Sequence, residues 1–92
     1  MTSNTTDKFW KCYNELPPEI KKKAKRVYET FLKNPDHPSL HFKQIYSKRS
    51  IYSVRISKSY RALGVLEDKN IIWFWIGSHS DYDKLIKKMS KS

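Results

Sequence analysis

The chain has 92 residues, with 19 lysines and arginines against nine acidic residues and a formal net charge of +10. This length leaves no room for a second core, so residues 1–92 are expected to form a single domain. So basic a chain attracts polyanions, which makes nucleic acid the leading partner class and an acidic protein the second.

The same composition excludes several other classes of protein. Cys12 is the only cysteine, so neither an intramolecular disulfide nor a cysteine-based zinc site can form. The first ten residues, MTSNTTDKFW, lack the apolar core of a signal peptide. The longest apolar run, IIWFWIG, is far shorter than the roughly 20 residues that span a bilayer. We therefore expect a soluble, cytoplasmic protein without a membrane partner.

Two helices are expected first along the chain. Thr6 can cap a short helix that ends at the LPP sequence, because proline disfavours helical geometry in the residue before it. A second helix can begin at Pro18, where the missing N–H costs nothing. Its apolar positions share one stripe: Ile20, Ala24, Val27, Tyr28 and Phe31. Its basic positions share the opposite face: Lys21, Lys22, Lys25 and Arg26. Together the two segments predict an antiparallel helical hairpin.

Four strands and a last helix are expected next. After the proline-containing connector at residues 34–39, the sequence becomes rich in β-branched and aromatic residues separated by short polar turns. The expected strands of this antiparallel meander are residues 40–46, 51–57, 60–67 and 70–77. A helix then opens at Ser80 or Asp81. Its apolar stripe is Tyr82, Leu85, Ile86 and Met89, and its other side carries Lys84, Lys87 and Lys88. The fold class is therefore α+β.

The turn at residues 57–59 places two like charges together. It makes Arg55 and Arg61 cross-strand neighbours, with Cβ atoms about 5 Å apart, an arrangement that destabilises a sheet.

A turn at residues 68–69 sets the next register. It places Gly64 opposite Trp73 and Ala62 opposite Trp75, so that each large ring meets a small residue on the expected core face. The remaining residues then share the other face: Ser53, Arg55, Arg61, Leu63, Val65, Ile72, Phe74 and Ile76. Its apolar strip is expected to be covered by a partner, or alternatively by the last helix.

The two arginines on that face suggest an anion site. Paired guanidinium groups repel each other, and a phosphate or carboxylate held between them relieves the repulsion. Alternatively, each arginine reaches solvent or pairs with a local acid such as Glu67. His79 follows the last strand and can transfer a proton in phosphoryl chemistry, whereas Tyr82 can stack on a base. The alternatives are a capping role for His79 and a core contact for Tyr82.

Two further groups are weaker candidates. Lys43 is expected one strand away from Arg55, where it adds a phosphate contact or is ordinary surface charge. Asp36, His37 and His41 have no spacing diagnostic of a metal site, so no metal is expected.

These motifs together resemble the RelE/ParE superfamily of bacterial toxins. The resemblance runs over nearly the whole chain, from LPPEI and NPDHPSLHFK to YSVRISKSYRALGVLEDKNIIWFWIG and the histidine beyond it. It implies a helical hairpin packed on a curved antiparallel sheet, and an antitoxin partner with an acidic amphipathic segment. RelE-like members cut mRNA in the ribosomal A site with the messenger's own 2′-hydroxyl as nucleophile, whereas ParE-like members act on DNA gyrase.

The resemblance also implies roles for individual residues. In the family's pattern, the basic residue of the second motif strand corresponds to Arg55, and the arginine of the YR sequence corresponds to Arg61. The catalytic residue beyond the glycine that ends the last strand corresponds to His79, and the C-terminal tyrosine to Tyr82. Many RelE-type toxins have an arginine where this chain has His79. The leading hypothesis is a metal-independent mRNA endoribonuclease without a cofactor, whose Lys43 and helical lysines contact RNA backbone. A gyrase inhibitor and a non-catalytic module that binds an acidic antitoxin remain as alternatives.

Overall fold

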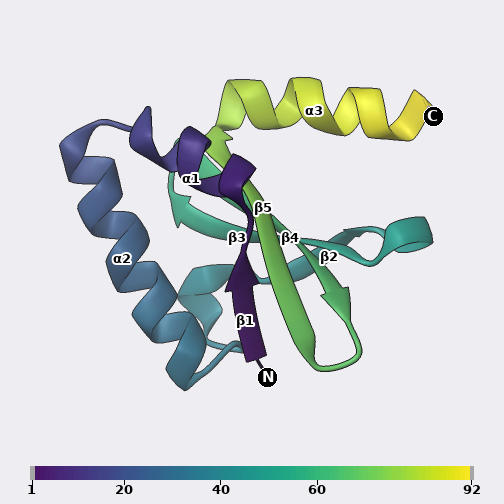
Figure 1. Cartoon of the computed structure of the whole chain (residues 1–92), viewed down its shortest axis with the longest axis horizontal. Helices are drawn as coiled ribbons and strands as arrows, with labels where there is room; N and C mark the ends of the chain where they lie inside the picture. The colour runs from purple at the N-terminus through teal and green to yellow at the C-terminus, as the bar shows by residue number, and fades with distance from the viewer. Residues whose placement is uncertain (1, 92) are drawn as a thin grey trace.

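The computed structural model describes residues 2–91, apart from the side chains of Ser47, Ser90 and Lys91, and it has the expected α+β architecture (Figure 1). The helices are α1 (Asp7–Asn14), α2 (Pro18–Lys33) and α3 (His79–Lys91), with short 3₁₀ turns η1 (Pro38–Leu40) and η2 (Ser47–Arg49). The strands are β1 (Thr2–Thr5), β2 (Lys43–Tyr46), β3 (Ile51–Ser57), β4 (Tyr60–Glu67) and β5 (Asn70–Ser78).

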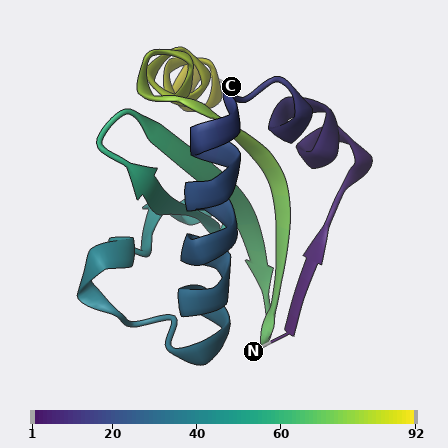
Figure 2. The ribbon, with the colours of Figure 1, turned by 90° about the vertical axis from the view of Figure 1, so that its left-hand side faces the viewer.

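The first two helices form for the reasons that the sequence suggests. The Thr6 hydroxyl accepts a hydrogen bond from the Phe9 amide at 3.1 Å and so caps α1. The second helix begins at Pro18, as expected. Figure 2 shows α2 lying across one face of the sheet, where it contacts β3, while α1 contacts β5. Both helices therefore cover the same face.

The sheet contains one strand more than expected. Its five strands have the order β1-β5-β4-β3-β2, and β1 lies parallel to β5 at one edge. The other neighbouring strands are antiparallel, as the meander predicted. The extra strand has the polar sequence TSNT and is held by backbone hydrogen bonds such as Thr2 N–H to Lys69 C=O at 2.8 Å. A strand without apolar alternation gives no periodic signal, so the sequence did not indicate it.

The register of the central strands is confirmed in part. Gly64 lies opposite Trp73, as expected, but Ala62 lies opposite Ile76 instead of Trp75. The difference arises from a bulge: Leu63 is opposite Trp75, which leaves Phe74 as an extra residue on β5. An extra residue reverses the alternation of a strand. The side chains beyond Phe74 therefore point to the face opposite to the one that the sequence predicted. The placement of Trp75 on the core face was therefore wrong.

The main core lies between the sheet and the first two helices. Trp73 makes an edge-to-face contact with Phe31 of α2, with ring centroids 5.3 Å apart. Ile76, which the sequence analysis placed on the other face, belongs to this core and is only 2% exposed. The other buried members of the cluster are Leu16, Ile20, Ala24, Leu40, Val54, Ile56, Ala62 and Ile71.

The second face of the sheet is also partly closed. Leu63 has no exposed surface and Ser53 has only 2%. The helix α3 contacts β4 and β5 and runs across the end of the sheet at which β5 finishes (Figure 1). It begins at His79, earlier than the expected Ser80 or Asp81, because the Ser78 hydroxyl accepts the Asp81 amide hydrogen bond and acts as the cap. No helix within residues 2–91 is long and apolar enough to cross a membrane.

Substituting Gly64 tests the packing of the core face. A Cβ atom at this position would lie 2.9 Å from both Ile71 Cγ1 and Trp73 Cε3, closer than packed carbons allow. We expect Gly64→Ala to lower the free energy of unfolding by about 1–3 kcal/mol, because overpacking outweighs the gain in chain stiffness. Urea unfolding measures the change. Lys58→Ala in the exposed turn should change stability by less than about 0.5 kcal/mol, and an equally stable Gly64→Ala protein would contradict the register.

Candidate functional site

Basic side chains gather on the sheet face that the first two helices do not cover. Residues directly opposite each other in an antiparallel pair share a face, and Arg55, Arg61 and Gly77 form one such row across β3, β4 and β5. The predicted cross-strand pairing of Arg55 with Arg61 is therefore confirmed. In the next row of the same face, Lys43 pairs with Ser53. We call the row of Arg55, Arg61 and Gly77 the arginine row.

The Arg61 guanidinium includes a hydrogen-bond donor that has no acceptor in the described part of the chain. Its guanidinium Nη1 is buried and has no hydrogen-bond partner among the described residues. A buried donor without a partner typically costs about 1–3 kcal/mol. Glu67 does not supply the missing partner, because it lies six positions further along β4, about 20 Å away at roughly 3.3 Å per residue. One guanidinium nitrogen of Arg61 is therefore without an acceptor in this conformation.

The other arginine contacts a histidine that the sequence analysis considered only as a metal candidate. Arg55 Nη1 lies 3.5 Å from Nε2 of His41, which has a left-handed backbone conformation (φ 47°) after η1. A guanidinium can only donate, so the imidazole Nε2 must accept. The strand register could have indicated this contact. Extending the antiparallel Lys43–Ser53 pairing by two residues places His41 level with Arg55. His37, the other candidate histidine, uses its Nδ1 to accept from the Ser39 amide.

His79 and Tyr82 lie together at the end of the sheet near the arginine row. The His79 amide donates to the Ser59 carbonyl at 2.7 Å, which holds the start of α3 against the β3–β4 turn. Its imidazole is 44% exposed and its Nδ1 lies 3.3 Å from Asp83 Oδ2. The Tyr82 ring is centred 5.5 Å from the imidazole. His79 follows Gly77, the residue opposite Arg61, by only two positions.

The predicted RNA-contacting lysines fall into two groups. Lys84, Lys87 and Lys88 are on α3, which begins beside the arginine row. Lys21, Lys22, Lys25 and Arg26 are on α2, which packs on the opposite face of the sheet. The α2 group therefore lies on the other side of the sheet from the arginine row.

Trp75 is an additional aromatic residue on the arginine face, the face of the sheet that carries the arginine row. A Cβ atom at Gly77 would lie 2.6 Å from Trp75 Cζ2, so the indole occupies the space that the glycine leaves beside Arg61. We had expected Trp75 on the core face, because alternation alone does not reveal the Phe74 bulge. An indole in this position can stack on an unpaired base.

Comparison with known families adds to this geometry. The model of the ParE-like toxin domain matches residues 18–84, a range that contains Arg55, Arg61, His79 and Tyr82. The chain belongs to the ParE-like toxin family, within the RelE/ParE superfamily. A search of curated protein sequences found no match.

Solved structures of toxins share the fold of this ParE-like domain. The RelB-RelE antitoxin-toxin complex from Methanococcus jannaschii is 22% identical, with a TM-score of 0.71 over 88% of this chain and 96% of that one. YafQ from E. coli is 14% identical, with a TM-score of 0.70 over 87% and 94%. The RelBE2 toxin-antitoxin complex from Mycobacterium tuberculosis is 17% identical, with a TM-score of 0.67 over 85% and 96%.

Replacing Arg61 with an uncharged side chain of similar length tests whether the Arg61 guanidinium lacks a stabilising partner in this ParE-like domain. Arg61→Met removes the unpaired donor and the repulsion from Arg55, so we expect a gain of about 0.5–1 kcal/mol in unfolding free energy at low salt. Urea unfolding at two salt concentrations measures the change, and the gain should shrink at high salt as the repulsion is screened.

Arg26→Met, on the exposed face of α2, is the matched control and should be close to neutral. A loss of more than 1 kcal/mol in Arg61→Met alone would show that the guanidinium has a stabilising partner and would contradict the unpaired site.

Proposed function

We propose that this ParE-like toxin domain is a ribosome-dependent mRNA endoribonuclease that inhibits translation and that a cognate antitoxin neutralises. The observation that carries the proposal is the unpaired Nη1 of Arg61, a residue directly opposite Arg55 in the sheet. Two solved relatives are toxin-antitoxin complexes, which supports an antitoxin partner for this chain. Translation takes place in the cytoplasm, where we expect this protein to act.

In this proposal the arginines bind the phosphate at which the chain is cut. The 2′-hydroxyl of the preceding ribose attacks the phosphorus, the bond to the 5′-oxygen of the next nucleotide breaks, and a 2′,3′-cyclic phosphate forms. The departing 5′-oxygen takes up a proton from solvent water. Negative charge builds on the phosphoryl oxygens, and donors already held in place stabilise that charge without reorganisation. Arg61 Nη1 has no hydrogen-bond partner among the described residues, so it can donate to such an oxygen once the guanidinium turns toward the substrate, and Arg55 provides the second fork.

His79 transfers the proton in this scheme. When Nδ1–H donates to Asp83 Oδ2, the imidazole keeps a lone pair at Nε2 and can accept the 2′-hydroxyl proton as a general base. Tyr82, beside the imidazole, provides a face on which a base can stack. The substrate supplies the nucleophile, so the scheme needs no metal ion or other cofactor.

The lysines nearest the arginine row bind RNA backbone in this scheme. Lys43 shares the arginine face, and Lys84, Lys87 and Lys88 are on α3 at the same end of the sheet. Contacts of this kind release counterions from RNA, so the affinity should fall as salt rises. A role of the α2 lysines in RNA binding stays a prediction, since they lie on the opposite face.

A second candidate function is inhibition of DNA gyrase. The description of the matching family as ParE-like favours it, because gyrase is the target of ParE-type toxins. The His79–Asp83 pair favours RNA cleavage, since a gyrase inhibitor without catalytic chemistry requires no such proton acceptor. In a third alternative, the basic surface serves only to bind an acidic antitoxin, and expression of the domain alone is harmless.

Expression in a bacterial host with mapping of mRNA ends tests the enzymatic proposal. Wild-type protein should create new 5′ ends within translated messages. Arg61→Ala should reduce cleavage about 10²–10³-fold through loss of charge stabilisation, and His79→Ala about 10²–10⁴-fold through loss of the general base. His37→Ala removes a histidine whose ring nitrogen accepts from the Ser39 amide within its own turn, and this variant should cleave normally. DNA damage without new mRNA ends would favour the gyrase candidate, and full cleavage by both site variants would refute the site.

A further inference from the structure

One proton transfer in the proposed cleavage has no protein group assigned to it. His79 removes the proton of the 2′-hydroxyl, but the 5′-oxygen leaves as an unstable alkoxide unless it gains a proton as its bond to phosphorus breaks. A positioned acid typically speeds such a step by about 10²–10⁴-fold. The attacking and leaving oxygens are roughly in line on opposite sides of the phosphorus. The acid is therefore needed on the far side of the phosphate from His79.

The sheet places one histidine at each end of the arginine row. From one edge to the other, the order is His41 level with Arg55 of β3, Arg61 of β4, and Gly77 of β5 with His79 two positions beyond. Neighbouring strands are about 4.8 Å apart, so the outer two strands of this row are about 14 Å apart. Imidazoles that enter this span from its two ends can flank a phosphate held by the arginines between them.

The local sequence presents the His41 side chain to the arginine row. Its neighbours are anchored in the core: Leu40 is 1% exposed, and the Phe42 ring stacks on Tyr52 with centroids 5.0 Å apart. The backbone of His41 is left-handed (φ 47°), a conformation in which histidine is more frequent than most residues other than glycine. With both neighbours packed, the His41 ring stays exposed, and its Nε2 lies 3.5 Å from Arg55 Nη1.

Phosphate binding at the arginine row would release the His41 ring. In the free protein Nε2 accepts from Arg55 and so carries no proton. A phosphate offers Arg55 two anionic oxygens that match its planar fork. When Arg55 turns to them, Nε2 loses its donor, and the negative charge beside it favours the protonated imidazole. The group that holds Arg55 in the free protein thus becomes an acid in the complex.

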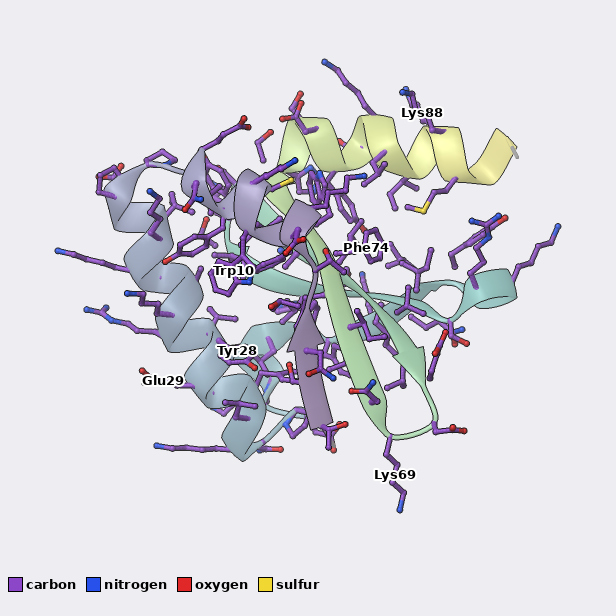
Figure 3. All side chains as sticks on the ribbon, in the orientation of Figure 1. Trp10, Tyr28, Glu29, Lys69, Phe74 and Lys88 are labelled. Carbon is purple, nitrogen blue, oxygen red and sulfur yellow. The ribbon has the colours of Figure 1, made fainter. Side chains whose placement is uncertain are left out.

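Other basic side chains at this end of the sheet are less suited to donate the proton. Guanidinium groups keep their protons, so Arg55 and Arg61 stabilise charge without transferring a proton. Lys88 on α3 points away from the sheet (Figure 3). His37 uses its ring to accept from an amide of its own turn. His41 combines a contact with the arginine row and a proton that exchanges near neutral pH.

We propose that His41 is a catalytic residue that donates a proton to the departing 5′-oxygen. The proposal rests on the proposed function, because it concerns the same cleavage step. The 2′-oxygen bonds to phosphorus and gives its proton to Nε2 of His79. The bond from phosphorus to the 5′-oxygen breaks, and this oxygen takes the proton of His41 Nε2 in place of one from solvent water. The products are a 2′,3′-cyclic phosphate and a 5′-hydroxyl, and proton exchange with water restores both imidazoles.

A sulfur atom at the leaving position of the substrate tests this role directly. Ribosomes are programmed with mRNA whose cleaved linkage carries either the natural 5′-oxygen or a bridging 5′-sulfur, and single-turnover cleavage by the purified toxin is measured. A thiol is a far stronger acid than an alcohol, so the thiolate leaves without a proton donor. His41→Gln should cleave natural mRNA about 10²-fold or more slowly than wild type, and 5′-sulfur mRNA within about threefold of wild type.

The choice of variants separates proton donation from positioning. Glutamine keeps an oxygen that can accept from Arg55 but has no proton to transfer near neutral pH, so His41→Gln removes the acid and retains an acceptor. His79→Ala is the matched comparison: it lacks the base, and the 5′-sulfur should not restore its cleavage. Thermal unfolding confirms that both variants are folded. A deficit of His41→Gln that persists with the 5′-sulfur would assign His41 to positioning alone and overturn the proposal.

The remaining outcomes distinguish this proposal from the proposed function. If wild type cleaves natural mRNA and His41→Gln cleaves it equally fast, the proton donor is wrong and the endoribonuclease stands. If the 5′-sulfur restores His79→Ala as well as His41→Gln, the two histidines do not divide the proton transfers and the proposal fails. If wild type cleaves neither mRNA on the ribosome, the proposed function fails, and the role of His41 fails with it.

Discussion

The forced proximity of Arg55 and Arg61 is the constraint on which the account depends. The two residues are directly opposite each other on β3 and β4, and backbone pairing prevents them from moving apart. The short turn after β3 fixes this register on one side, and the fit of Gly64 against Trp73 fixes β4 against β5. The sheet therefore holds two cations side by side, with one buried nitrogen of Arg61 unpaired. We propose that this arrangement is unfavourable in the free protein and is relieved when an anion binds.

The Phe74 bulge places Trp73 and Trp75 on opposite faces of the sheet. Before it, Trp73 points to the helices and fills the core; after it, Trp75 points to the arginine row and packs over Gly77. Without the extra residue, both indoles would be on the core face. The bulge thus places an aromatic surface beside the proposed phosphate site.

The sequence predicted those features that depend on short-range pattern. The central strands, the Thr6 cap, the start of α2 at Pro18 and the Arg55–Arg61 pairing follow from alternation, turn residues and proline geometry. The bulge was not predictable from alternation, because three consecutive large apolar residues fit either face. The strand β1 is polar and is held by its backbone, so composition gave no sign of it. The contact of His41 with Arg55 depends on a left-handed residue that ends a 3₁₀ turn, which the pattern of side chains does not encode.

The site residues differ in how far the structure supports them. The pairing of Arg55 with Arg61 and the proximity of His79 to Tyr82 are structural facts, whereas their catalytic roles remain predictions. The likeness to solved toxins at 22% identity or less establishes the fold and not the chemistry. Chemistry therefore has to be argued from the arginine row.

A double-mutant cycle between Arg55→Met and Arg61→Met tests the central claim most directly. Unfolding free energies of the four proteins are measured at low ionic strength, with and without inorganic phosphate, at matched ionic strength. The account predicts an unfavourable coupling of several tenths of a kcal/mol without phosphate, the size expected for like charges opposite each other. Phosphate should reduce this coupling or reverse its sign. A coupling that is absent, or one that phosphate does not change, would contradict the claim that the sheet holds the two arginines for an anion.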